Sequence, residues 1–169
     1  MTRQPSHPAR GHLPHRLARA GLIQPVAAVL TDRIDDVAVA EAAARMARAR
    51  RVPLLLIAVM PPHTSRSCGP VSAPVRAVLA RVMPKIGPGA TGYIPEVFHL
   101  PAGNGSRLAA AKELLALATR HRAPDVVASR RGPQGLDAHA LIEAAALRGG
   151  QFVHAVAPAA WVPLRSPSP

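Results

Sequence analysis

The sequence predicts a single α/β domain built on a doubly wound parallel sheet of five strands, with helices on both faces. Short apolar runs alternate with Ala-rich helical patterns five times, which is the order of strands and helices in a parallel sheet. The run at residues 26–31 is apolar throughout, as expected for a strand that helices cover on both faces. The length of 169 residues fits one domain with loose ends.

Local residue patterns place the elements along the chain. We predict strands at residues 26–31, 54–59, 94–100, 126–128 and 151–156. We predict helices at about residues 35–51, 71–85, 106–121 and 137–147. Asp35 or Asp36 can cap the first helix, and Asn104 or Ser106 can cap the third. Pro95 lacks an amide hydrogen, so it predicts that the third strand starts at a sheet edge.

Basic and proline-rich segments flank the predicted domain. Residues 1–24 contain four arginines, three histidines, three prolines and no acidic residue. Such a segment buries too little apolar surface to order itself, so we expect a disordered basic tail. The domain is predicted to span residues 25–162, and a Pro/Ser tail at 163–169 follows it.

The composition is strongly basic, with 21 Lys and Arg residues against 9 Asp and Glu and a net charge of +12. This balance favours anionic partners such as nucleotides, nucleic acid or acidic proteins. A single cysteine, Cys68, excludes an intramolecular disulfide and a cysteine-based metal site, and it fits a reducing cytoplasm. No apolar run approaches the roughly 18 residues of a membrane span, so we expect a cytoplasmic protein without a membrane partner.

The stretch 124–135 is the main candidate for a binding site. Its apolar strand is followed by Ser129, Arg130, Arg131, Gly132 and Gly135, and then by a helical pattern. Glycines let backbone amides approach an anion, and the next helix adds its positive N-terminal end, so the loop is a candidate phosphate cradle. Alternatively, the two glycines are needed only to turn the chain between strand and helix.

Asp32 is the second candidate, because it follows the first strand directly. In doubly wound sheets, ligands bind beyond the carboxyl ends of the strands, at the point where the strand order reverses. If the fourth strand resumes on the other side of the first, Asp32 faces the glycine loop. A nucleotide then fits between them, with the carboxylate toward the ribose or adenine and the amides toward phosphate. Asp32 could equally be a residue that only begins the helix.

These residues resemble the universal stress protein family over about residues 24–162. The run 26–32, the alanines of the next helix and residues 54–62 are similar to the family's opening strand, helix and strand. Residues 123–130, Ala-Pro-Asp-Val-Val-Ala-Ser-Arg, resemble its Ala-Asp-Leu-Ile-Val-Val-Gly-Ser-Arg segment. The resemblance implies a Rossmann-like sheet of order 3-2-1-4-5, dimerisation through the last strand and, in one branch, ATP binding.

Gly132 and Gly135 match the first two glycines of that branch's Gly-x2-Gly-x9-Gly-Ser/Thr motif. Nine further residues lead to Ala145-Ala146, so the closing Gly-Ser/Thr is absent. The turn after Asp32, usually Gly-Ser, is Arg33-Ile34. The sequence therefore retains Asp32 and the first half of the phosphate loop, Ser129, Arg130, Gly132 and Gly135. It predicts weak binding of ATP or another adenine nucleotide.

Three functions remain open. The first is a cytoplasmic stress-response and regulatory module that binds an adenine nucleotide weakly. The second is a protein of the same fold that has lost nucleotide binding and acts as a homodimeric interaction module with an unknown protein partner. Its self-contact would involve Phe152, Val153, Val156 and Trp161. The third is non-specific nucleic-acid binding through the arginine surface and the tail, by backbone contacts alone because the four aromatic residues offer no stacking platform.

Catalysis and metal binding have no comparable support. No His, Asp, Ser or Cys residues are placed at the candidate site in a pattern that identifies a triad. The histidines of the domain fall on separate elements, so a metal site would need a convergence that nothing in the sequence indicates. We therefore expect neither an enzyme nor a metal site.

Overall fold

The computed structural model describes residues 23–62, 69–87, 90–103, 105–133 and 135–157. Its strands are β1 (Val26–Leu30), β2 (Leu54–Met60), β3 (Tyr93–His99), β4 (Asp125–Ser129) and β5 (Phe152–Val156). Its helices are α1 (Asp36–Arg50), α2 (Ala73–Ile86), α3 (Ala109–Arg120) and α4 (Ala138–Arg148). All neighbouring strands are parallel, and their order is β3-β2-β1-β4-β5. This order confirms the doubly wound sheet that the sequence predicts.

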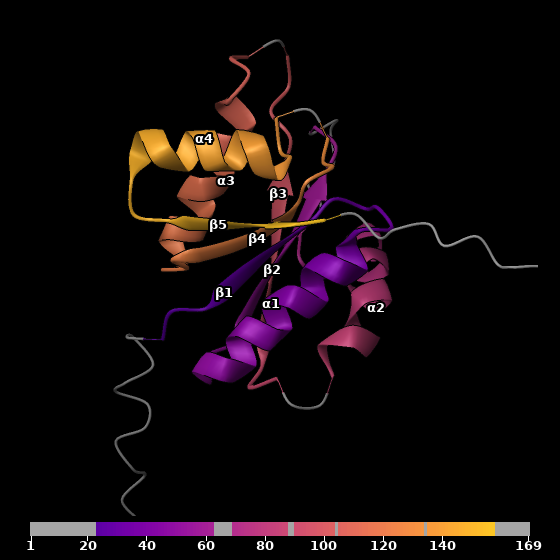
Figure 1. Ribbon diagram of the computed structural model, residues 1–169. Helices are drawn as coiled ribbons and strands as arrows, with labels where there is room; N and C mark the ends of the chain where they lie inside the picture. Colours follow the sequence, from indigo (N-terminus) through magenta and orange to yellow (C-terminus); the bar gives the residue numbers. More distant parts are fainter. Residues whose placement is uncertain (1–22, 63–68, 88–89, 104, 134, 158–169) are drawn as a thin grey trace, which may run out of the picture.

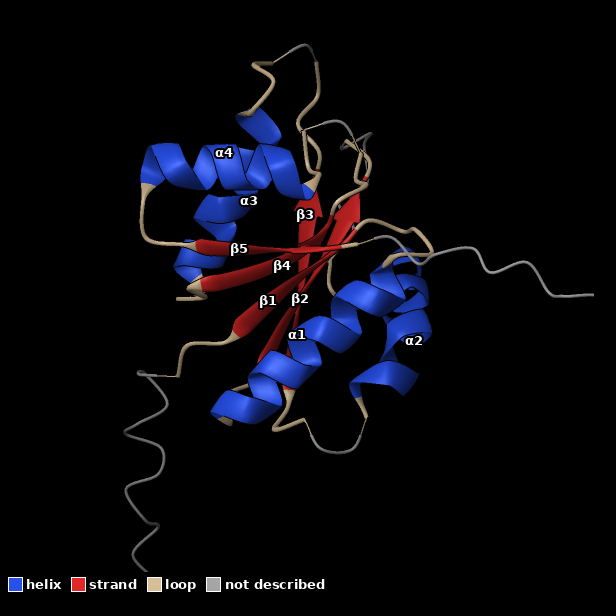
Figure 2. Cartoon of the chain, in the orientation of Figure 1, coloured by secondary structure: helices blue, strands red, loops and turns tan. Residues whose placement is uncertain are grey.

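Two helical layers cover the sheet, α1 and α2 on one face and α3 and α4 on the other (Figures 1 and 2). Successive strand residues face opposite layers, so Val26 and Ala28 join the core under α1 and α2, whereas Ala27 and Val29 join the core under α3 and α4. Every residue of β1, β2 and β4 is buried. This explains why those segments are continuously apolar rather than alternating.

The two edge strands are more open than the central ones. Pro95 lies in β3, which has β2 as its one neighbour among the described strands, so the prediction of an edge position is confirmed. At the opposite edge, β5 leaves Phe152 exposed. An edge strand pairs with a neighbour on one side only, so part of it stays in contact with water. Its residues therefore need not be continuously apolar.

Helix α3 begins later than the sequence predicts. Its first residue is Ala109, with Leu108 at the N-cap and no capping side chain, so the expectation for Ser106 is wrong. The carbonyl of Ser106 instead accepts the Ala109 amide at 2.8 Å. The cap candidate Asn104, Cys68, Trp161 and both predicted tails, apart from residues 23 and 24, lie outside the described residues. Within the described ranges, no helix combines the length and apolar character needed to cross a membrane.

Candidate functional site

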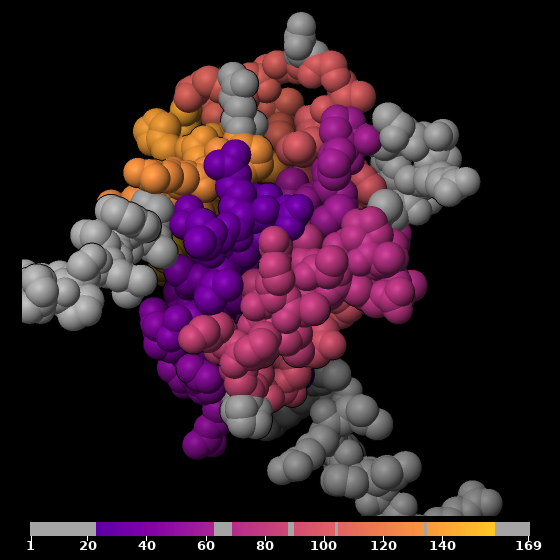
Figure 3. Space-filling model, turned by 90° about the vertical axis from the view of Figure 1, so that its right-hand side faces the viewer, coloured from indigo at the N-terminus to yellow at the C-terminus, as the bar shows by residue number. Residues whose placement is uncertain are grey.

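The carboxyl ends of β1 and β4 form the point at which the sheet reverses direction, because β1 pairs with β2 on one side and β4 on the other. The structure thus brings the turn after β1, with Asp32, beside the loop 129–135 after β4. Figure 3 looks onto this edge: the indigo turn after β1 lies next to the orange start of α4, with the purple end of β2 and the salmon start of α3 nearby.

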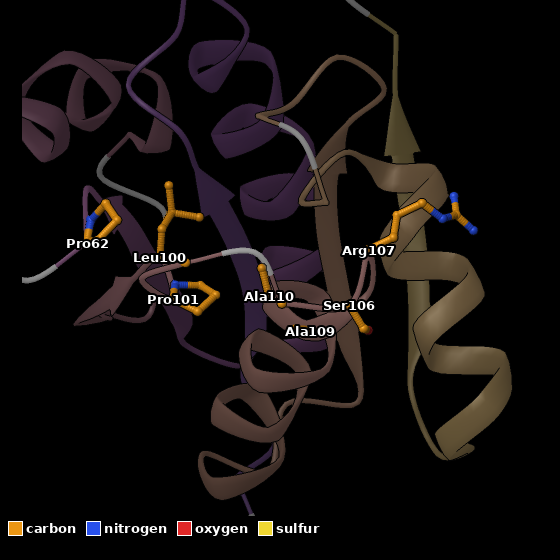
Figure 4. A pocket seen from close by; sticks show the side chains of 9 residues that line it. Pro62, Leu100, Pro101, Ser106, Arg107, Ala109 and Ala110 are labelled. Atoms are coloured by element: carbon orange, nitrogen blue, oxygen red, sulfur yellow. The ribbon is translucent and has the colours of Figure 1, made fainter.

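A groove runs along this edge. One cavity of about 270 Å³ is lined by residues 31–33, by the ends of β2 and β3 and by Pro133 of the glycine loop. A second cavity of about 320 Å³ lies beside the start of α3 (Figure 4). Pro62 and Leu100 line both cavities, so the two cavities are adjacent. Arg107 contacts the second cavity, but its guanidinium points to α4, where it pairs with Glu143.

Asp32 projects from a left-handed turn, with φ of 61°. Its side chain is 64% exposed and forms an ion pair with Arg81 of α2. Because both side chains of the ion pair are exposed, the pair contributes little stability, and a ligand could compete for either partner. Nothing in the local periodicity of the sequence indicates this partner, which lies 49 positions away.

Asp36, expected only as a helix cap, shapes the turn after β1. It is buried, and its carboxylate accepts hydrogen bonds from the amides of Thr31, at 2.8 Å, and Arg33, at 3.1 Å. Burial raises the pKa of Asp36 above its ordinary value, although these hydrogen bonds and the charge of Arg81 oppose the rise. The carboxylate holds Asp32 and its neighbours in one conformation.

Ser129 connects the two sides of the site. Its hydroxyl donates to Oδ2 of Asp35, at 3.1 Å, and accepts the Arg131 amide, at 3.0 Å. Ser129 and Asp35 are both buried. The side chain that the sequence assigns to a nucleotide therefore already has two protein partners, and it ties the end of β4 to the start of α1.

The glycine loop uses several of its own amides within the protein. The Arg130 amide donates to the Val156 carbonyl, and the Leu136 amide donates to the Pro133 carbonyl, each at 2.9 Å. The side chains of Arg130 and Arg131 are exposed at the loop surface. The loop thus offers cations to an anion, but its Arg130, Arg131 and Leu136 amides already donate within the protein.

Both glycines of the loop have packing reasons. A Cβ at Gly132 would lie 2.7 Å from the Asp137 nitrogen and 2.8 Å from the Leu136 oxygen. Gly135 has a φ of +82°, and a Cβ there would lie 2.9 Å from the Arg107 oxygen. The loop therefore needs glycine at both positions for turning and packing, which is the alternative that the sequence left open, whether or not the loop also binds an anion.

The N-terminus of α4 carries its own anion. Asp137 is the N-cap, and its carboxylate accepts the Ala140 amide at 3.0 Å. A carboxylate at this position satisfies the helix dipole and repels a phosphate that would bind the same amides. Among the described residues, no three His, Cys, Asp or Glu side chains gather in a way that could hold a metal ion.

No protein-family model and no curated protein sequence matches the chain. Solved structures do. A universal stress protein in complex with cAMP is 18% identical, with a TM-score of 0.54 over 79% of this chain and 95% of the other. A universal stress protein from Archaeoglobus fulgidus is 18% identical, with a TM-score of 0.53 over 82% of this chain and 98% of the other. The universal stress protein from Archaeoglobus fulgidus in complex with dAMP is also 18% identical, with a TM-score of 0.50 over 78% and 96%. The chain therefore has the fold of the universal stress proteins.

Proposed function

We propose that the chain is a cytoplasmic, non-catalytic regulatory module of the universal stress protein type that binds an adenine nucleotide weakly. The observation that carries the proposal is the groove at the reversal point of the sheet, where residues 31–33 and Pro133 line one cavity. Two structures of the same fold hold cAMP and dAMP. The two adjacent cavities, of about 320 and 270 Å³, are near the lower end of the size range of small-molecule sites.

The ligand that fits this edge best carries one phosphate. Arg130 and Arg131 offer positive charge at the loop surface, but Asp137 already occupies the end of α4 and Ser129 is engaged by Asp35. Each further phosphate would add negative charge at an end of the sheet that already holds four aspartates, at 32, 35, 36 and 137. We therefore expect AMP or cAMP to bind at least as well as ATP.

The test is a thermal melt of the purified full chain with AMP, cAMP or ATP, after mass spectrometry of the denatured protein for nucleotide that co-purifies. A ligand at ten times its Kd stabilises the folded state by about 1.4 kcal/mol, which raises the Tm of a domain of this size by roughly 4 °C. Asp32→Asn should abolish that rise, because asparagine tolerates the left-handed turn but lacks the charge.

Glu41→Gln is the matched control, since it removes an exposed carboxylate from the surface of α1 and should leave the rise intact. If no nucleotide co-purifies and millimolar AMP, cAMP and ATP all leave the Tm unchanged, the nucleotide proposal fails. The second candidate function, a dimeric interaction module without nucleotide, then takes its place.

The open edge at β5 favours this second candidate. Phe152 is 69% exposed, and β5 has β4 as its one neighbour in the described sheet. The Phe152 amide donates to Pro124, and the Val156 carbonyl accepts the Arg130 amide. Because backbone groups alternate along a strand, those of Val153 and Ala155 point outward and can pair with a second copy.

We expect Ala155→Pro and Phe152→Asp each to lower the mass measured by sedimentation from dimer to monomer. Proline at 155 removes an outward amide and leaves the pairing with β4 in place, so the monomer should stay folded. Val71→Asp, which changes an apolar side chain exposed elsewhere, is the control and should remain dimeric. An unchanged mass for both β5 variants would exclude this interface.

A further inference from the structure

The end of the sheet at which the strands begin lies opposite the groove. The carboxyl ends of all four helices lie at this end. This follows from the topology, because each helix runs back against parallel strands; in Figure 1, β1, β4 and β5 begin on the side where α1 and α4 end. Every helix has a basic residue and no acidic residue in its last turn. The basic edge consists of Arg48, Arg51, Lys85, Arg120, Arg122 and Arg148.

Little negative charge balances the basic edge. Four of the nine acidic residues, Asp32, Asp35, Asp36 and Asp137, belong to the other end of the sheet. At the basic edge, Asp125 is buried and already hydrogen-bonded to Arg50 and His154. Glu96 pairs with His121 at 2.7 Å. Four of the nine acidic residues therefore lie at the groove end, and fewer acidic residues accompany the cations of the basic edge.

Two arginines of the basic edge stand where glycine is the favoured residue. Arg51 and Arg122 both have a φ of 56°, in the left-handed region that follows a helix. An arginine in this conformation is strained, and glycine would follow the helix without that strain. Both side chains are exposed. The two positions therefore add cations to the basic edge beyond the last turns of α1 and α3.

The cations of the chain are almost all arginines. In all, the chain has 19 arginines and 2 lysines. The planar guanidinium binds phosphate through two parallel hydrogen bonds, which favours arginine over lysine in contacts with nucleic-acid backbones.

We propose that the basic edge binds the phosphate backbone of duplex nucleic acid, without sequence preference. Single strands are a poorer fit, because their binding needs aromatic side chains next to one another. The exposed aromatics at this edge, Tyr93 and Phe152, begin the two outermost strands. With four strand spacings between them, they lie roughly 19 Å apart and form no stacking ladder. This activity is independent of the nucleotide groove, which lies at the other end of the strands.

The test measures binding of the full chain to a short DNA duplex of random sequence by fluorescence anisotropy, between roughly 50 and 200 mM salt. In the double variant Arg51→Gly, Arg122→Gly, the slope of log K against log salt should fall by about 2, one for each lost phosphate contact. Glycine suits both left-handed positions, so the variant should stay folded, which a thermal melt checks.

The control is Arg45→Ala, Arg76→Ala, which removes the same charge from exposed helix surfaces outside the basic edge and should leave the slope unchanged. An equal fall in both double variants would mean that only net charge matters, and it would overturn the proposal. An unchanged slope in the Arg51→Gly, Arg122→Gly variant would overturn it too. So would binding to phosphatidylserine vesicles without binding to the duplex, since that result assigns the edge to a membrane surface.

Discussion

Replacing Gly132 with alanine is expected to destabilise the domain by about 3 kcal/mol, at the upper end of the cost of overpacking. The new Cβ would meet three backbone atoms: the Asp137 nitrogen at 2.7 Å, and the Asp137 Cα and Leu136 oxygen at 2.8 Å. Backbone atoms cannot turn aside as a flexible side chain can, so the first turn of α4 must shift. The Tm should fall by roughly 10 °C in a thermal melt followed by circular dichroism.

Gly69→Ala is the matched control, because a Cβ at Gly69 has no atom within 4 Å. It should change the Tm by less than about 2 °C. A Gly132→Ala variant that melts normally but no longer responds to AMP would contradict the packing explanation. It would instead assign this glycine to the close approach of a phosphate, as the sequence motif alone predicts.

Much of the fold could be predicted because its signals are local. Continuous apolar runs mark β1, β2 and β4, which helices cover on both faces, and Pro95 marks an edge. The topology then brings Asp32 near the loop after β4 without any knowledge of side chains. The family resemblance supplied the strand order, and the structure confirms it.

The contacts within the site could not be predicted in the same way. The ion pair of Asp32 with Arg81 joins residues 49 positions apart, and the hydrogen bond of Ser129 with Asp35 joins residues 94 apart. Periodicity assigns a residue to a face but not to a partner on another element. Asp137 shows this limit of sequence patterns. An aspartate at the start of a helix predicts an N-cap, and its negative charge at the same time disfavours a phosphate at that helix end.

The uneven distribution of charge between the two ends of the sheet could not be predicted from local patterns either. Basic residues in the last turn of each helix are an ordinary response to the helix dipole and carry no information about function by themselves. Only the parallel topology, which places all four helix ends at one end of the sheet, brings these four local preferences together.

The second large effect is expected at Asp125, where β4 begins. Its side chain is 5% exposed and accepts hydrogen bonds from His154 of β5, at 2.7 Å, and from Arg50 of α1. Asp125→Asn removes the charge from both interactions. Removing one partner of a buried pair costs about 3–5 kcal/mol, but Arg50 and His154 are half exposed and can turn to water, so we expect about 2 kcal/mol in urea unfolding at neutral pH.

The pH dependence of the free energy of unfolding shows whether Asp125 acts as a charge or only as a neutral hydrogen-bond acceptor. Burial opposes ionisation of Asp125, but the hydrogen bonds from Arg50 and His154 outweigh it and hold the pKa below the ordinary 3.8. A lowered folded-state pKa adds stability that is complete above 3.8 and is lost as the pH falls from 3.8 through the folded value. The deficit of Asp125→Asn relative to the original chain should therefore be constant above pH 3.8 and shrink below it.

Asp36→Asn provides the opposite case, because burial raises the pKa of Asp36 above 3.8. The original chain gains stability as the pH falls from that raised pKa to 3.8, and the variant does not. Relative to the original chain, Asp36→Asn should therefore lose stability on acidification above pH 3.8, where the deficit of Asp125→Asn stays flat. A deficit of Asp125→Asn that stays constant down to the onset of acid unfolding would mean that the carboxylate contributes no charge interaction between α1, β4 and β5.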